Sequence, residues 1–120
     1  MPSYDTNNIF AKILRGEVPN DTVLETEHSL AFNDIAPQAP RHVLVIPKGA
    51  YMAYDDFSSD ASAEELVDFH RAVAEVIRII EAEEKGFRAI TNARTHGMQE
   101  VSHFHMHILA GQLMGPLLAS

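Results

Sequence analysis

The sequence predicts an α+β domain with a mostly antiparallel five-stranded sheet, one short helix and one long helix. Apolar residues recur at helical spacing in two segments, whereas five short segments have the pattern of strands. Two of these strand segments flank a turn, which indicates a hairpin and an antiparallel sheet. The 120 residues are 46% apolar and 22% charged, which suits one globular core. We therefore expect residues 1–120 to form a single domain.

The first half of the chain begins with the short helix. In residues 7–16, four apolar side chains share one helical face, and Gly16 ends the segment. Strands at residues 23–25 and 30–32 are expected to pair around the turn at residues 26–29. Residues 35–40 contain two prolines, which cannot donate to a ladder, so a loop should precede the buried strand at residues 42–46.

The long helix has a marked start and stop. Ser62 and Glu65 have the spacing of a capping box, and Lys85-Gly86 is typical of a C-terminal end. Between them the apolar residues keep helical spacing, which predicts one amphipathic face. Two further strands are expected at residues 87–91 and 104–108, joined by a loop that contains glycine.

Composition excludes several classes of protein. Nine basic and seventeen acidic residues give a formal net charge of −8, which argues against binding polymeric nucleic acid through many phosphates. Imidazoles and backbone N–H groups could still hold a single nucleotide. The absence of cysteine excludes disulfides and thiolate chemistry. Because no apolar run has the length of a signal peptide core or a membrane span, we expect a cytoplasmic protein without a membrane partner.

Three histidines alternate with apolar residues near the end of the chain, at His103, His105 and His107. On a strand these imidazoles share one face, while Phe104 and the apolar residues after it face a core. The outer two would lie about 13 Å apart, so one phosphate would contact two neighbours at most. His105, in the centre, is the expected nucleophile, because neutral imidazole is nucleophilic near pH 7.

A metal site is the main alternative for this histidine row. A His-x-His pair on a strand can bring two imidazoles to one zinc ion, and His42 or Asp34 could supply a third ligand. The isolated histidines at positions 28, 70 and 96 are instead expected to be ordinary surface or hydrogen-bonded side chains.

Residues 103–109 (HFHMHIL) resemble the signature of the histidine-triad (HIT) family. Residues 9–19, 31–40 and 42–48 resemble the Hint branch of that family in the same order and at similar intervals, so the likeness extends from about residue 8 to residue 115. The resemblance implies a HIT-like fold and a homodimer, and it suggests a bacterial member. It also implies a ligand that is a purine nucleoside monophosphate or its phosphoramidate or adenylate, with no metal or other cofactor.

The resemblance also implies roles for individual residues. His105 would attack the α-phosphorus, His107 would hold a phosphate oxygen, and His103 and His42 would support the site. Asp34 would accept the ribose hydroxyls. An apolar slot would hold the base, and a loop would line the phosphate and leaving group. Phe10, Ile13, Phe32 and Ile35 match the slot, with ordinary core packing as the other interpretation for Ile13 and Phe32; Asn92, Gln99, Glu100 and Val101 match the loop.

Two positions depart from the family pattern. Met98 stands where a glycine normally precedes the glutamine, and Glu100 stands where eukaryotic members have a serine. The predicted activity is that of a nucleoside phosphoramidase-like hydrolase with a nucleotidyl-histidine intermediate. The alternatives are a nucleotide-binding regulatory dimer with incidental turnover, a dinucleoside polyphosphate hydrolase, and the metallohydrolase described above.

Overall fold

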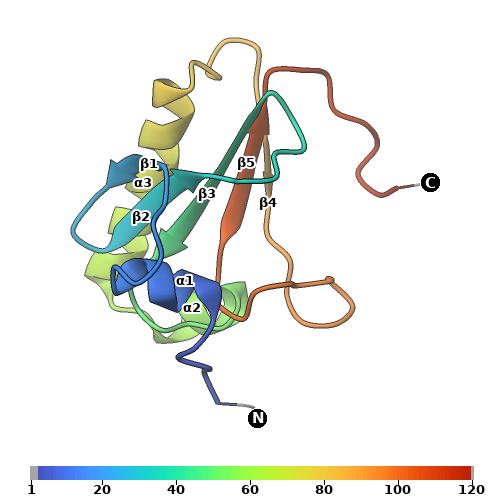
Figure 1. Ribbon diagram of the computed structural model, residues 1–120. Coiled ribbons are helices and arrows are strands. Elements are labelled where there is room, and N and C mark those ends of the chain that lie inside the picture. Colours follow the sequence, from blue (N-terminus) through green and yellow to red (C-terminus); the bar gives the residue numbers. More distant parts are fainter. Residues whose placement is uncertain (1–2, 120) are drawn as a thin grey trace.

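A computed structural model describes residues 3–119 (Figure 1). Within these residues, three helices and five strands follow one another as α1 (Ile9–Leu14), β1 (Thr22–Glu25), β2 (Ser29–Asn33), β3 (Arg41–Pro47), α2 (Tyr54–Asp60), α3 (Ala63–Ile79), β4 (Arg88–Ile90) and β5 (Met106–Ala110). None of the helices in these residues is both long and apolar enough to cross a membrane.

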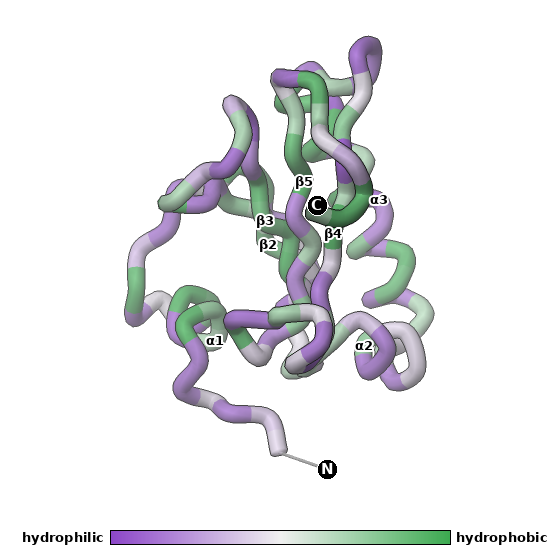
Figure 2. The backbone as a smooth tube through the Cα atoms, turned by 90° about the vertical axis from the view of Figure 1, so that its right-hand side faces the viewer, coloured by the Kyte–Doolittle hydropathy of each residue, from purple (hydrophilic) through white to green (hydrophobic). Residues whose placement is uncertain are grey.

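The five strands form one sheet in the order β1-β2-β3-β5-β4, and every neighbouring pair is antiparallel. This confirms the predicted fold class and the predicted hairpin. Helices α3 and α1 lie on opposite faces of the sheet (Figure 2). The central strand β3 pairs with β2 on one side and with β5 on the other, so it joins the hairpin to the histidine segment.

The pleat of the central strands divides the core into two clusters. Val43 and Val45 of β3 face α3 with Phe69 and Phe104, whereas Leu44 and Ile46 face α1. His42 precedes Val43, so the alternation places its side chain on the α1 face. The triad segment follows the same rule, because Phe104 and Ile108 lie in the α3 cluster. The sheet thus separates an apolar face from a face that carries imidazoles.

Helix α3 ends earlier than the sequence predicted. Its N-terminal capping box at Ser62 and Glu65 is present. The helix stops at Ile79, because Glu81 adopts a left-handed conformation with φ of 58°. The N–H groups of Glu81 and Ala82 bond back to the carbonyls of Arg78 and Ile77, which is a Schellman end made without glycine. The predicted stop at Lys85-Gly86 is therefore wrong by about a turn and a half.

Two further elements, α2 and β5, differ from the prediction. Helix α2 was not predicted, because it is rich in aspartate and serine and buries a single side chain, Phe57. Strand β5 begins at Met106, so only His107 of the triad lies within a strand. His103 and His105 lie in the irregular segment that leads into it.

Candidate active site

His103 is fully buried, and both of its ring nitrogens are hydrogen-bonded. Nε2 lies 2.8 Å from the carbonyl oxygen of Pro47, which can only accept, so Nε2 carries the proton. Nδ1 lies 2.6 Å from the hydroxyl of Tyr4, which therefore donates to it. His103 has no ring nitrogen left for a substrate or a metal ion.

His105 is held by its predecessor in the triad. Its Nδ1 lies 2.7 Å from the backbone carbonyl oxygen of His103 and donates to it. The lone pair of the neutral ring is therefore on Nε2. The ring of Phe10 packs against His105 at a centroid distance of 5.0 Å, and the Thr91 hydroxyl donates to the His105 carbonyl at 2.8 Å. The first two contacts orient the ring of the predicted nucleophile, and the third holds its backbone.

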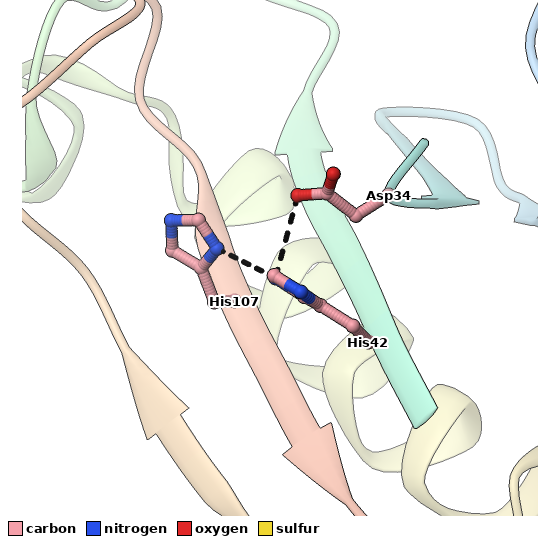
Figure 3. Close-up of side chains that lie close together, drawn as sticks. All are labelled: Asp34, His42 and His107. Carbon is pink, nitrogen blue, oxygen red and sulfur yellow. Dashed lines mark hydrogen bonds and ion pairs between the residues drawn. The ribbon is translucent and has the colours of Figure 1, made fainter. Parts of the chain in front are cut away.

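A second chain of contacts links His42, His107 and Asp34 (Figure 3). The backbone N–H of Gln38 donates to Nδ1 of His42 at 3.1 Å, so the proton of His42 is on Nε2. This Nε2 lies 2.9 Å from Nδ1 of His107 and 3.4 Å from a carboxylate oxygen of Asp34. Because Nδ1 of His107 accepts, its Nε2 carries a proton and is a hydrogen-bond donor.

Asp34, His42 and His107 are also the residues that could hold a metal ion. Within residues 3–119 their ligand atoms lie within 4.8 Å of one another. His103 cannot bind a metal ion here, because both of its ring nitrogens are already hydrogen-bonded. The possible ligands therefore differ from a His-x-His pair of the triad. The contacts of His42 with His107 and Asp34 also explain, without a metal ion, why these three side chains lie close together.

Burial keeps the imidazoles of this site neutral at pH 7. Burial, with a smaller contribution from the positive charge of a protonated His105, lowers the pKa of His103 and of His107 to about 4. Burial also lowers the pKa of His42 and of His105, although the carboxylate of Asp34 partly opposes it at both. Neutral rings have the fixed donor and acceptor roles described above, and a neutral His105 is nucleophilic.

A cavity of about 380 Å³ lies beside His105 and His107. Its volume is in the range of small-ligand sites. Its lining contains most of the residues that the sequence pointed to, together with Ala36, Gln38 and Met98, which had not been assigned to it. The predicted residues in the lining are Phe10, Asp34, Ile35, Asn92, Gln99, Glu100, Val101, His105 and His107.

The four apolar residues predicted for the base slot fall into two groups. Phe10 lines the cavity, and so does Ile35, whose side chain is 98% exposed. Phe32 and Ile13 instead pack with Phe10 in the core cluster beneath α1, and the rings of Phe32 and Phe10 meet edge to face at 5.6 Å. Phe32 and Ile13 are therefore placed to support the wall of the cavity rather than to form it.

The loop at residues 92–101 is braced by Gln99. Its side-chain N–H groups donate to the carbonyls of Met52 and Val101, and its oxygen accepts from the N–H of Arg94. Met98 has a φ of 57°, a left-handed conformation that costs a residue with a side chain about 1 kcal/mol. The N–H of Met98 bonds to the Thr95 carbonyl, within the loop. The guanidinium of Arg94 pairs with Asp55 at 3.0 Å and so ties the loop to α2.

Sequence reasoning did not identify the residues that set the tautomers. Tyr4, Gln38 and Pro47 act on His103 and His42 through a hydroxyl, an N–H and a carbonyl. They lie at least four positions from the histidine they contact, and two of the three bonds use backbone groups. No sequence pattern marks such partners, because every residue has a backbone. The assembled site can present a nucleophilic nitrogen and a neighbouring N–H donor to one bound group.

Comparison with known proteins gives consistent results. Residues 15–114 match the HIT domain family. The chain is 54% identical over 116 residues to an uncharacterised 13.2 kDa HIT-like protein of Azospirillum brasilense, over 97% of this chain and 95% of the relative. It is 43% identical over 114 residues to the purine nucleoside phosphoramidase of Escherichia coli (strain K12), over 92% of each chain.

A solved structure shares the same architecture. A HIT family hydrolase from Clostridium thermocellum matches with a TM-score of 0.85 and 38% sequence identity, over 94% of this chain and 97% of the other.

Proposed function

Because the chain belongs to the HIT domain family, we propose that it is a nucleotide hydrolase of the phosphoramidase kind. It cleaves the bond between the phosphorus of a purine nucleoside monophosphate and an amine leaving group, through a nucleotidyl intermediate on His105. One observation carries the proposal. His105 is a buried, neutral imidazole whose Nδ1 is tied to a carbonyl, so its nucleophilic nitrogen is Nε2 in the lining of a cavity.

The proposed reaction has two displacement steps at phosphorus. Nε2 of His105 forms a bond to phosphorus, the bond from phosphorus to the leaving nitrogen breaks, and the amine leaves with a proton taken up from water. Water then attacks the same phosphorus, its proton passes to solvent, and the monophosphate leaves His105 free. Two easier steps thus replace one difficult step.

His107 and Asp34 bind the substrate in this proposal. Nε2–H of His107 donates to a non-bridging phosphate oxygen, where negative charge grows during attack. His42 fixes that donor by bonding the other nitrogen of His107. Asp34 accepts the ribose hydroxyls, although one of its oxygens already accepts from the N–H of Ala36 at 2.8 Å. The base lies between Phe10 and the exposed Ile35, and Phe32 and Ile13 pack behind Phe10.

The charges of the cavity favour an amine over a polyphosphate as the leaving group. The lining has two carboxylates, Asp34 and Glu100, and contains neither lysine nor arginine among the described residues. Glu100 is exposed at the edge of the cavity. A polyphosphate would bring several negative charges next to these carboxylates without a cation to neutralise them. A neutral or cationic amine meets no such repulsion, which disfavours the dinucleoside polyphosphate alternative.

The proposal includes a cytoplasmic homodimer. Three exposed apolar side chains lie near one edge of the sheet: Phe87 just before the edge strand β4, and Leu113 and Leu117 in the tail after β5. In Figure 1 the tail runs away from the body of the domain beside β4. A partner subunit would cover this apolar surface. Light scattering at micromolar concentration should give twice the chain mass of 13.3 kDa, and a monomer alone would contradict the dimer.

The covalent intermediate is the direct test of the proposed function. We expect adenosine phosphoramidate labelled in the phosphate to leave label on the protein when the reaction is stopped within one turnover in alkaline denaturant. Peptide mapping should place the added mass on His105. Rapid turnover without any label on the protein would argue for direct attack by water. Binding of AMP without turnover of phosphoramidates would favour the regulatory dimer.

A further inference from the structure

We infer that the hydroxyl of Tyr4 is a positioning group for the active site, acting through His103 on the nucleophile His105. This inference rests on the proposed function, but Tyr4 itself lies outside the HIT match, which begins at residue 15. Tyr4 donates to Nδ1 of His103 at 2.6 Å, and the two rings meet edge to face with centroids 5.7 Å apart.

The partners of His103 leave it a single arrangement. The Pro47 carbonyl requires a proton on Nε2, so the neutral ring has an unprotonated Nδ1 that needs a donor. Tyr4 is the donor that meets it. Without the hydroxyl, a fully buried nitrogen would have no partner, which is costly enough for the ring to turn or the segment to shift.

Any shift of His103 reaches the nucleophile directly. The backbone carbonyl of His103 accepts from Nδ1 of His105 at 2.7 Å and thereby decides which nitrogen of His105 carries the lone pair. Phe10 packs against both rings, at 6.3 Å from His103 and 5.0 Å from His105. The hydroxyl of Tyr4 therefore holds the His103 ring, and the backbone carbonyl of His103 in turn orients the imidazole of His105.

The segment that carries Tyr4 is anchored to the domain. The carbonyl of Asp5 accepts from the backbone N–H of Asn8, the N-cap of α1. The guanidinium of Arg15, just after α1, donates to the carbonyl of Thr6 at 2.7 Å. These bonds on both sides of α1 hold residues 5–8 beside the helix that supplies Phe10. The position of the Tyr4 hydroxyl is thus coupled to the wall of the cavity.

Tyr4→Phe tests the inference, because it keeps the ring and removes only the donor. We expect kcat on adenosine phosphoramidate to fall about three- to tenfold, with KM and AMP affinity unchanged. Nitrogen-15 NMR should show a change in the signal of the unprotonated Nδ1 of His103, because that nitrogen loses its hydrogen-bond donor. Tyr54→Phe is the matched control, since it removes the hydroxyl of a partly exposed tyrosine whose ring packs on Phe104. It should change neither kcat nor the histidine spectrum.

The two readouts separate the inference from the proposed function. If the wild type lacks phosphoramidase activity, the proposed function fails, while the NMR signals still report whether the Tyr4 hydroxyl donates to Nδ1 of His103. A Tyr4→Phe variant with wild-type kcat and an unchanged His103 spectrum would overturn the inference. Equal losses of kcat in Tyr4→Phe and Tyr54→Phe would show a general loosening of the fold and would overturn the inference as well.

Discussion

The two faces of the strands β3 and β5 are built from the same backbone but have different chemistry. Toward α3 they present Val43, Val45 and Ile108, which pack in one cluster with phenylalanines whose rings contact one another. Toward α1 the same strands present His42 and His107, whose rings are hydrogen-bonded at 2.9 Å. The α3 face is stabilised by apolar packing alone, whereas the α1 face combines apolar packing at Leu44 and Ile46 with fixed donors and acceptors.

This difference shows how one strand pair can serve both stability and catalysis. Alternation in the pleat lets every second residue belong to the core, so the imidazoles between them can be buried without leaving unpaired polar atoms. No described side chain has a buried nitrogen or oxygen without a partner. Substitutions on the α3 face should therefore change stability, and substitutions on the α1 face should change chemistry first.

The largest effect is expected from His105→Asn on the α1 face. The amide nitrogen is not a nucleophile, so kcat/KM should fall by about three orders of magnitude or more, while AMP binding persists. His103→Asn should keep more residual activity, because His103 acts only through His105. Steady-state kinetics and calorimetric titration with AMP provide the comparison. Equal losses in both variants would contradict the role of His105 as the nucleophile.

Phe104→Ala tests the α3 face. Phe104 is buried among Phe57 and Phe69, so truncation should lower the free energy of unfolding by about 3–5 kcal/mol. Val67→Ala, on the exposed side of α3, should change it by less than about 0.5 kcal/mol. Urea denaturation measures both. Comparable losses in the two variants would mean that this face does not carry the stability assigned to it.

Acid should destabilise the protein through the α1 face. The pKa of His103 is about 4 when folded and returns to about 6.5 on unfolding, so between these values the unfolded chain binds the extra proton. Stability contributed by the neutral ring is full above pH 6.5 and is lost as pH falls. His103 alone should cost about 2 kcal/mol between pH 7 and pH 5. Urea titrations at these two values would contradict this if stability rose on acidification.

Asp34→Asn should weaken AMP binding by about 1–2 kcal/mol, because a neutral amide oxygen accepts the ribose hydroxyls less strongly. The sharper measurement compares AMP with its 2′,3′-dideoxy analogue. The wild type should discriminate between them and the variant should not. Asp60→Asn, which removes a charge from the exposed end of α2, is the control. Undiminished discrimination in Asp34→Asn would place the ribose elsewhere.

The smallest expected effect concerns Glu100 at the edge of the cavity. Glu100→Gln should reduce kcat/KM about two- to fivefold for a leaving amine with a second positive charge, such as a lysine-derived amide, because an exposed ion pair contributes little. The same variant should treat an uncharged amine like the wild type. An equal loss on both substrates would show that Glu100 does not interact with the charge of the leaving group.

The sheet could be predicted from the sequence because its strands are marked by local pattern. Residues 42–46 are a continuous apolar run after a proline-rich loop, and they became the centre of β3. The end of α3 could not be predicted, because Glu81 takes a left-handed conformation that its sequence does not favour. Helix α2 depends on the packing of Phe57 rather than on the propensities of its aspartates and serines.

The site shows the same division between local and non-local information. The triad and its alternation were visible in the sequence, and so was Asp34 after β2. The tautomers were not, because they depend on Tyr4, Pro47 and Gln38, which reach the imidazoles from other segments. Gln99 matched the phosphate loop, but its amide is engaged in bracing that loop, a role that only the folded chain reveals.

The alternation between Phe104 and Ile108 also determines which changes of chain length the protein can tolerate. One residue inserted or deleted between His103 and His107 would turn part of the segment over, sending an imidazole toward Phe69 and an apolar side chain toward the cavity. Residues 81–87 have no such constraint, since they are mostly exposed and join α3 to β4. Homologous chains should therefore differ freely in length at residues 81–87 and should keep the same number of residues between His103 and His107.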